Sequence, residues 1–295
     1  MKMVWRSFLG LALNLLVACA GIPALDSASP TLTATSTPWP PTPTLTPTAT
    51  VTFTPLPPTL IPTPTWVFQP AGDVTCPILL YHQIADITPP SQYYMPPADF
   101  KVQMEALRDW GYTPIPVSLL VQAITSGAAL PPRPIVITFD DGDQNVYTNA
   151  FPVMRALGFP AVIFVISSAV NGQDHLTSDE ILEMVAAGWE VGDHSMTHLN
   201  LTSDHGQVWV EASQSRLDLQ ASLGIPINTF AYPYGAADTF VMEKVSRYGY
   251  RAAFGLGTSS VQGPDNLFYL SRIEVRYGTT LDQFAAFLPW SEPVP

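Results

Sequence analysis

The stretch Ile135-Val136-Ile137-Thr138-Phe139-Asp140-Asp141-Gly142 decides how the rest of this sequence is interpreted. Its apolar and β-branched run predicts a strand buried on both faces, as in a parallel sheet covered by helices. The carboxyl ends of such strands carry the chemistry of α/β folds, so we expect Asp140 and Asp141 to lie in a functional site. Successive strand residues point to opposite faces, and a turn at Gly142 could bring both carboxylates into one pocket with different roles.

Composition limits the classes of function. The chain has 295 residues, of which 47% are hydrophobic and 12% charged, and its formal net charge is −12. This length fits one domain of roughly 200–250 residues plus an appendage. A protein that binds nucleic acid through the phosphate backbone needs a basic surface. We therefore expect no nucleic-acid partner, and a neutral or cationic substrate.

Residues 1–19 have the pattern of a secretory signal. Lys2 and Arg6 precede an apolar run that is too short for a transmembrane helix. The run ends in Leu16-Val17-Ala18-Cys19, which resembles a bacterial lipobox and implies cleavage before Cys19 and lipidation of its thiol. We expect an extracytoplasmic protein held by this lipid at the bacterial cell membrane or cell surface, with Cys76 as a free thiol. An ordinary signal peptide that contains a cysteine is the alternative.

Residues 20–72 are rich in proline and threonine, and no charged residue occurs from Pro30 to Pro70. Such a segment cannot form a packed core, and its prolines favour extended polyproline II. We expect a disordered stalk that holds a folded domain, residues 73–295, away from a membrane.

Strand and helix patterns alternate through the expected domain, with short connections. The expected strands are Pro77–His82, Pro114–Val117, Ile135–Phe139, Ala161–Ile166, Trp189–Gly192, Thr229–Tyr232, Arg251–Phe254 and Tyr269–Val275. The expected helices are Pro97–Gly111, Ser118–Gly127, Val146–Gly158, Ser178–Ala187, Val208–Leu223, Asp238–Tyr248 and Leu281–Phe287. This alternation predicts a parallel α/β architecture, and the number of strands favours a barrel over an open sheet.

Two histidines follow the strand expected at Trp189–Gly192. In His194-Ser195-Met196-Thr197-His198 they stand four residues apart, which on a helical turn would let both imidazoles meet one cation. A catalytic zinc site keeps three protein ligands and one open position for water. One carboxylate of the Asp140–Asp141 pair would be the third ligand, and the other would accept a proton from that water. Two surface histidines beside a helix start are the alternative.

A third segment, Phe230-Ala231-Tyr232-Pro233-Tyr234-Gly235, also follows an expected strand. Its rigid aromatic turn can present backbone N–H groups to a developing oxyanion. Taken alone the signal is weak, because an aromatic Pro-Gly turn is more often only a turn.

Together these segments resemble the motifs of the polysaccharide deacetylase family, carbohydrate esterase family four, also called the NodB homology domain. Thr138–Gly142 resembles its first motif, His194–His198 its second, and the Tyr-Pro-Tyr-Gly turn its third. The resemblance covers roughly residues 74–288. It implies a distorted (β/α) barrel of about seven strands, a divalent metal, and removal of acetyl groups from N-acetylated sugars. Zn²⁺ is the expected metal, with Co²⁺ or Ni²⁺ as alternatives.

The resemblance also implies residue roles. Asp140 would be the general base, and Asp141, His194 and His198 would bind the metal. Tyr234 would supply an oxyanion N–H.

Two departures from the family pattern matter. Many members have an arginine at the position of Ala231, where it pairs with the base; Arg272 is the expected replacement and Arg133 a weaker candidate. Many members also carry a late histidine as general acid, but here no histidine follows His205. His82, at the end of the first expected strand, can fill that role, with a buried structural histidine as the alternative. An early acid resembles the subgroup that acts on poly-β-1,6-N-acetylglucosamine.

The resulting interpretation is a monomeric, lipid-anchored, metal-dependent N-deacetylase of a GlcNAc-containing glycan, with poly-GlcNAc favoured. A peptidoglycan or chitin-type deacetylase and an O-acetyl xylan esterase would use the same site. A glycan-binding lipoprotein without turnover and a metallophosphoesterase are more remote alternatives.

Overall fold

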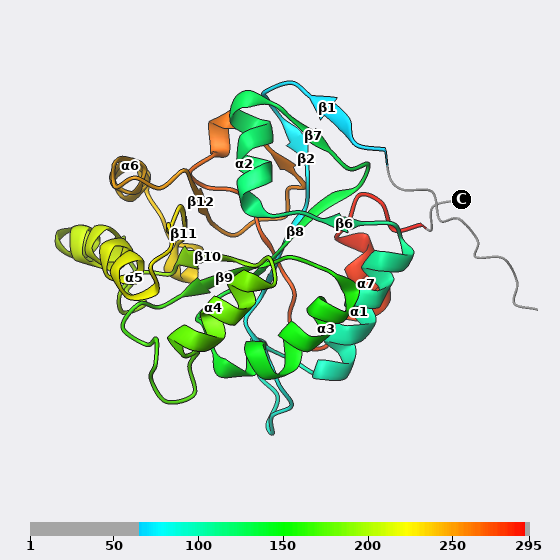
Figure 1. Cartoon of the computed structure of the whole chain (residues 1–295), viewed down its shortest axis with the longest axis horizontal. Coiled ribbons are helices and arrows are strands. Elements are labelled where there is room, and N and C mark those ends of the chain that lie inside the picture. The colour runs from blue at the N-terminus through cyan, green and yellow to red at the C-terminus, as the bar shows by residue number, and fades with distance from the viewer. Residues whose placement is uncertain (1–64, 293–295) are drawn as a thin grey trace, which may run out of the picture. The chain divides into compact units, whose positions relative to one another are not determined.

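The computed structural model describes residues 65–292 (Figure 1). The expected signal segment, Cys19 and the stalk as far as residue 64 lie outside the described residues. Ordered structure begins before the expected boundary at residue 73, because strand β1 (Val67–Gln69) pairs antiparallel with β7 (Ala128–Leu130). The stretch from 65 to 69 contains no proline and is rich in strand-forming residues, which accounts for a strand ahead of residue 73.

A curled parallel sheet forms the centre of the molecule. Its path runs β12-β11-β10-β9-β8-β3-β14, with β6 paired to β8 off this path. The strands are β3 (Ile78–Tyr81), β6 (Thr113–Pro114), β8 (Pro134–Phe139), β9 (Val162–Val165), β10 (Glu190–Asp193), β11 (Thr229–Ala231), β12 (Ala252–Phe254) and β14 (Ile273–Glu274). All neighbours are parallel. A bridge between Phe254 and Leu270 brings the two ends of the path together. The expected distorted barrel of about seven strands is confirmed.

Helices cover the outer face of this sheet (Figure 1). They are α1 (Pro97–Asp109), α3 (Phe151–Leu157), α4 (Ser178–Ala186), α5 (Ser215–Leu223), α6 (Thr239–Arg247) and α7 (Leu281–Ala286). Apolar side chains on their inner faces join those of the sheet in one large core cluster. A second cluster fills the concave side, where α2 (Val117–Ser126) packs with Val136, Phe164 and Phe254. The curled sheet is therefore a packed core, with room for a site only at its rim.

Local sequence explains where these elements begin and end. All six residues of β8 are buried, as its unbroken apolar run predicts. Helix α1 starts at Pro97. Proline is favoured at the first position of a helix because the backbone N–H that it lacks would have no partner within the helix there. A capping box at Thr177 and Glu180 starts α4. Gly192 in β10 admits the ring of Phe164, since a Cβ there would come within 2.3 Å of it.

Two expected helices begin differently from the prediction. A π-helical segment, η1 (Val146–Ala150), precedes α3, and another, η3 (Trp209–Gln214), precedes α5. Two short pairs were not expected: β2 (Val74–Thr75) with β13 (Val261–Gln262), and β4 (Gln83–Ile84) with β5 (Tyr94–Met95). Among residues 65–292, no helix has both the length and the apolarity needed to cross a membrane.

Candidate active site

A pocket of about 220 Å³ lies at the carboxyl ends of the central strands. Its lining contains the seven residues that the sequence analysis assigned to the site, from segments that follow β3, β8, β10 and β11 and, for Arg272, from the residue directly before β14. The lining residues are Leu80, His82, Tyr93, Asp140, Asp141, His194, His198, Tyr234, Gly235, Leu256, Arg272, Glu274 and Arg276. The structure thus brings together residues separated by almost two hundred positions in the chain.

A left-handed turn separates the two adjacent carboxylates. Strand β8 ends at Phe139, and Asp141 and Gly142 then adopt φ values of 72° and 78°. This backbone region favours glycine, so an aspartate there is held by its surroundings. Asp140 consequently stays buried at the end of the strand, whereas Asp141 is partly exposed on the pocket wall.

Asp141, His194 and His198 have the geometry of a cation site. The Oδ1 atom of Asp141 lies 3.5 Å from Nε2 of His194 and 3.4 Å from Nε2 of His198. Tetrahedral ligands at zinc bond lengths of about 2.0–2.1 Å would stand about 3.3 Å apart. The same Oδ1 atom is buried without a hydrogen-bond partner. An unpaired buried oxygen facing two ring nitrogens at this spacing fits a divalent cation.

The two histidines lie in a loop, so the expected helical turn is wrong. Ser195 and His198 have φ values of 66° and 62°, and the rings approach to 4.8 Å between centroids. Glu211, buried on η3, holds the loop: its carboxylate accepts hydrogen bonds from the backbone N–H and the hydroxyl of Thr197, at 2.9 and 2.7 Å. The left-handed residues Ser195 and His198 thus bring the two imidazoles together, as a helical turn would also have done.

Hydrogen bonding and burial suit both imidazoles to bind a cation. Nδ1 of His194 lies 2.8 Å from the carbonyl oxygen of Ala231, which can only accept, so Nδ1 carries the proton. The lone pair of Nε2 then faces the pocket. Burial, followed by the nearby His194, lowers the pKa of His198. Both effects favour the neutral rings that a metal requires.

Asp140 is paired with Arg272. Two parallel hydrogen bonds join them, Nη1 to Oδ1 at 2.6 Å and Nη2 to Oδ2 at 2.8 Å. The side chains are only 3% and 1% exposed. The Arg272 guanidinium also lies 5.4 Å from the ring centroid of Phe164 and donates through Nε to the carbonyl of Gly255. Arg133, the weaker candidate, instead donates to the carbonyls of Trp110 and Glu292.

The ion pair sets the charge of Asp140. Burial alone would raise the pKa of this carboxyl, but Arg272 and His194 outweigh it and lower the pKa to about 2. Asp140 is therefore ionised at neutral pH. One of its oxygens also lies 3.6 Å from Nε2 of His194, which places this ionised carboxylate beside the candidate cation site.

His82 borders the pocket on the β3 side. Its Nδ1 atom is buried without a hydrogen-bond partner and lies 4.0 Å from a carboxylate oxygen of Glu274. The other oxygen of Glu274 accepts a hydrogen bond from Nε of Arg276 at 2.6 Å and forms an ion pair with its Nη2 at 2.5 Å. The ring of Tyr93 packs edge-on to His82, with centroids 5.0 Å apart.

Tyr234 borders the pocket on the opposite side. It has a φ of 61° in the turn η4 (Pro233–Gly235), and its side chain is 63% exposed. Its ring lies 4.6 Å from that of His198 between centroids.

Several functional candidates escaped the sequence reasoning, namely Glu274, Arg276, Glu211 and Tyr93. The first two had a signal that could have found them, because Arg272, Glu274 and Arg276 alternate along the expected strand Tyr269–Val275 and the residue that follows it, and so share a face. Glu211 on η3 and Tyr93 in the turn before β5 lie far in sequence from the site motifs, and no local pattern marks them.

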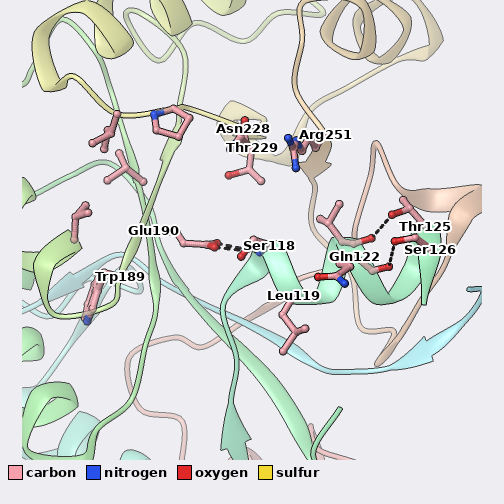
Figure 2. A pocket seen from close by; sticks show the side chains of 15 residues that line it. Ser118, Leu119, Gln122, Thr125, Ser126, Trp189, Glu190, Asn228, Thr229 and Arg251 are labelled. Carbon is pink, nitrogen blue, oxygen red and sulfur yellow. Dashed lines mark hydrogen bonds between the residues drawn. The ribbon is translucent and has the colours of Figure 1, made fainter. Parts of the chain in front are cut away.

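A larger cavity, of about 740 Å³, lies at the amino ends of the strands (Figure 2). It is bordered by α2 and by residues at the starts of β10, β11 and β12, and it contains none of the expected site residues. Figure 2 shows Glu190 directed at Ser118. The backbone N–H of Ser118 donates to both carboxylate oxygens of Glu190, at 3.1 and 3.2 Å. This carboxylate therefore caps the first turn of α2.

Comparison with known proteins gives consistent matches. A sequence profile of the polysaccharide deacetylase family matches residues 127–253. A polysaccharide deacetylase structure from Bacillus cereus is 30% identical, with a TM-score of 0.65, covering 72% of this chain and 68% of that one.

Two further matches are to proteins whose names are more specific than that of the family. A poly-β-1,6-N-acetyl-D-glucosamine N-deacetylase of Staphylococcus aureus is 28% identical over 158 residues, which cover 48% of this chain and 54% of that protein. The structure of IcaB from Ammonifex degensii is 27% identical, with a TM-score of 0.62, and the match covers 76% of this chain and 98% of that one.

Proposed function

This chain belongs to the polysaccharide deacetylase family, and from that premise we propose that it hydrolyses N-acetyl groups of a GlcNAc-containing polysaccharide. The arrangement that carries the proposal is the turn at Asp140 and Asp141. The turn directs Asp141 toward His194 and His198 at the spacing of cation ligands. It keeps Asp140 beside them, paired with the buried Arg272. A metallohydrolase needs these two functions, a cation holder and a proton acceptor, within one pocket.

The residues divide the chemistry as follows. Asp141, His194 and His198 would hold a divalent cation, for which Zn²⁺ is our choice because two of the three donors are imidazoles. When bound, the cation lowers the pKa of the attacking water and polarises the acetyl carbonyl, which suits a base as weak as Asp140. Asp140 then accepts the proton of that water, with its orientation fixed by Arg272.

Proton donation and charge stabilisation fall to the two sides of the pocket. His82 donates a proton to the departing amine, so that acetate and a free amino sugar are released. Glu274 faces Nδ1 of His82 and favours a proton on that nitrogen, so that Nε2 is the atom that takes up a proton and gives it to the departing amine. The backbone N–H of Tyr234 stabilises the developing oxyanion.

Poly-β-1,6-GlcNAc is the substrate we favour. Two observations support this choice. One is the early position of His82. The other is the similarity to a protein named for this substrate, at 28% identity, and to one named IcaB, at 27% identity. A peptidoglycan or chitin-type deacetylase and an O-acetyl xylan esterase would use the same residues. We propose both as alternatives.

Acetate release from a defined panel tests the proposal. The panel contains β-1,6 and β-1,4 GlcNAc oligomers, peptidoglycan and acetylxylan, and the control is the Asp141→Asn variant. We expect release from β-1,6 oligomers, its loss on chelation, and its recovery with added Zn²⁺. Faster release from acetylxylan than from any GlcNAc oligomer would overturn the N-deacetylase assignment.

We propose further that Cys19 carries a lipid that anchors the enzyme outside the cytoplasm. The support is the sequence Leu-Val-Ala-Cys after a short apolar run. Cys19→Ser should release the protein from membranes or block its processing. If that variant partitions into detergent as the parent chain does, the anchor lies elsewhere.

A further inference from the structure

The larger cavity lies at the opposite end of the sheet from the candidate active site. Its volume of about 740 Å³ falls within the roughly 300–1,000 Å³ of small-molecule sites. Strand β10 shows the separation, because its first residue, Glu190, lines this cavity, whereas its last, Asp193, directly precedes His194 in the catalytic pocket. The two linings share no residue, so a ligand in this cavity leaves the catalytic pocket free.

Arg251, directly before β12, gives the cavity a positive charge that the protein itself leaves unneutralised. Of the lysines and arginines in the part of the chain that the structure describes, each of the others has an ion pair, a hydrogen bond or an aromatic ring as partner. The Arg251 side chain has none of these there, although the chain has 24 acidic residues and only 12 lysines and arginines. Its guanidinium is therefore available to a carboxylate, which it can bind through two parallel hydrogen bonds.

The one acidic residue in the cavity lining does not neutralise Arg251. Both carboxylate oxygens of Glu190 accept the backbone N–H of Ser118, at 3.1 and 3.2 Å. Glu190 thus serves the first turn of α2, and the charge that the cavity offers to a ligand is that of the arginine.

Four uncharged polar side chains complete the lining around Arg251, namely Ser118, Gln122, Asn228 and Thr229. Figure 2 shows Asn228, Thr229 and Arg251 across the cavity from α2, which carries the other two. Within residues 65–292 none of the four side chains forms a hydrogen bond, although Thr229 is only 6% exposed. Hydroxyl and amide groups can both donate and accept, which suits the hydroxyls of a sugar.

We propose that this cavity is a non-catalytic site for an acidic sugar, meaning a hexose or N-acetylhexosamine that carries one carboxylate. Arg251 binds the carboxylate, the four polar side chains bind hydroxyls, and the apolar wall of Leu119, Ile225 and Pro226 packs against the C–H face of the ring. A single carboxylate fits, because a net charge of −12 repels a polyanion. The inference goes beyond the proposed function and does not depend on it, since the two sites lie at opposite ends of the sheet.

Binding of matched sugars to the whole chain, measured by calorimetry and saturation-transfer NMR, tests the proposal. The probes are N-acetylmuramic acid beside N-acetylglucosamine, and glucuronic acid beside glucose. We expect each acidic sugar to bind roughly five- to tenfold more tightly than its neutral counterpart, as a carboxylate–arginine pair open to solvent on one side allows. In Arg251→Gln this preference should disappear.

Two further variants sharpen the test. Arg247→Gln is the charge-matched control, because this exposed arginine on α6 pairs with Glu243 outside the cavity, so its variant should keep the preference. Gln122→Trp fills the cavity from an exposed position on α2 and should abolish binding of both acidic sugars without lowering the melting temperature. Hydrogen exchange should show that N-acetylmuramic acid protects residues 225–229 and not residues 194–198.

Several outcomes would overturn the inference. Equal affinity of the parent chain for acidic and neutral sugars, or equal losses in Arg251→Gln and Arg247→Gln, would show that Arg251 selects no carboxylate. Protection confined to residues 194–198 would place the binding in the catalytic pocket. Alanyl-alanine has a carboxylate without sugar hydroxyls, and if it binds as tightly as N-acetylmuramic acid, the cavity is a peptide site instead.

Discussion

Replacing Arg272 with methionine should destabilise the protein strongly, because it leaves the Asp140 carboxylate buried and unpaired. Both side chains are almost fully buried, and two short hydrogen bonds join them. Removing one partner of such a pair costs about 3–5 kcal/mol. For a domain of this size each kcal/mol lowers the melting temperature by about 2–4 °C, so we expect a fall of roughly 6–20 °C at pH 7.

A double-variant cycle measured by calorimetry in chelator separates this effect from metal binding. Adding Asp140→Asn to Arg272→Met removes the orphaned charge and should restore much of the lost stability. Arg276→Met is the matched control, since this arginine is 55% exposed and its pair with Glu274 should contribute about 0–1 kcal/mol. Additive losses in the double variant, or equal losses for Arg272→Met and Arg276→Met, would refute the reasoning.

The same pair predicts a pH dependence. The pKa of Asp140 in the folded protein is about 2, below its ordinary value of 3.8. The pair therefore stabilises the fold above about pH 4, and its contribution of about 2 kcal/mol is lost as the pH falls toward 2. In Arg272→Met this acid-side loss should disappear, because burial then raises the pKa of the carboxyl.

Three further predictions concern single residues. Asp141→Ala should lose metal and activity together, whereas Asp140→Asn should keep most of its metal and still lose rate. Elemental analysis beside kinetics on both variants tests this. Loss of metal from Asp140→Asn and its retention by Asp141→Ala would exchange the two roles. His82→Ala should retain metal and lose about 10²–10⁴-fold in kcat, least for substrates with good leaving groups, and a full rate would place the acid elsewhere. Burial raises the pKa of Asp193 to about 7 although Tyr250 donates to it, so stability should fall by up to about 4 kcal/mol as the pH rises from 4 to 7. Asp193→Asn should flatten that slope in urea titrations, and an unchanged slope would assign it to another group.

Short-range signals made much of this fold and site predictable from the sequence. The run before Asp140 is buried along its whole length, so hydrophobicity alone identified β8. The cation ligands occur in two compact motifs at the ends of strands, and parallel strands bring such ends to one edge. Family resemblance then separated Asp140 from Asp141, which the residues alone had left open.

Long-range and backbone-specific features were harder to predict. The pairing of β1 with β7 depends on a partner some sixty residues away. The histidine loop was interpreted as a helical turn because spacing of four suits a helix, whereas the real loop uses left-handed residues held by Glu211. No spacing rule identifies Glu211 as the support of that loop, since it acts through packing of separate elements.

The pairing of Asp140 with Arg272 makes the reactive centre a composite of the whole domain. The stretch that matches the family profile, residues 127–253, contains the three candidate cation ligands and the proposed base, but neither His82 nor Arg272. A fragment cut to that stretch would hold the candidate metal ligands and lack both Arg272, which keeps Asp140 ionised, and His82, the proposed proton donor. During synthesis, likewise, Asp140 precedes its arginine by 132 residues. The proposed site therefore becomes complete only when β14, the last strand of the central sheet, has docked, so that activity would report this late step of folding.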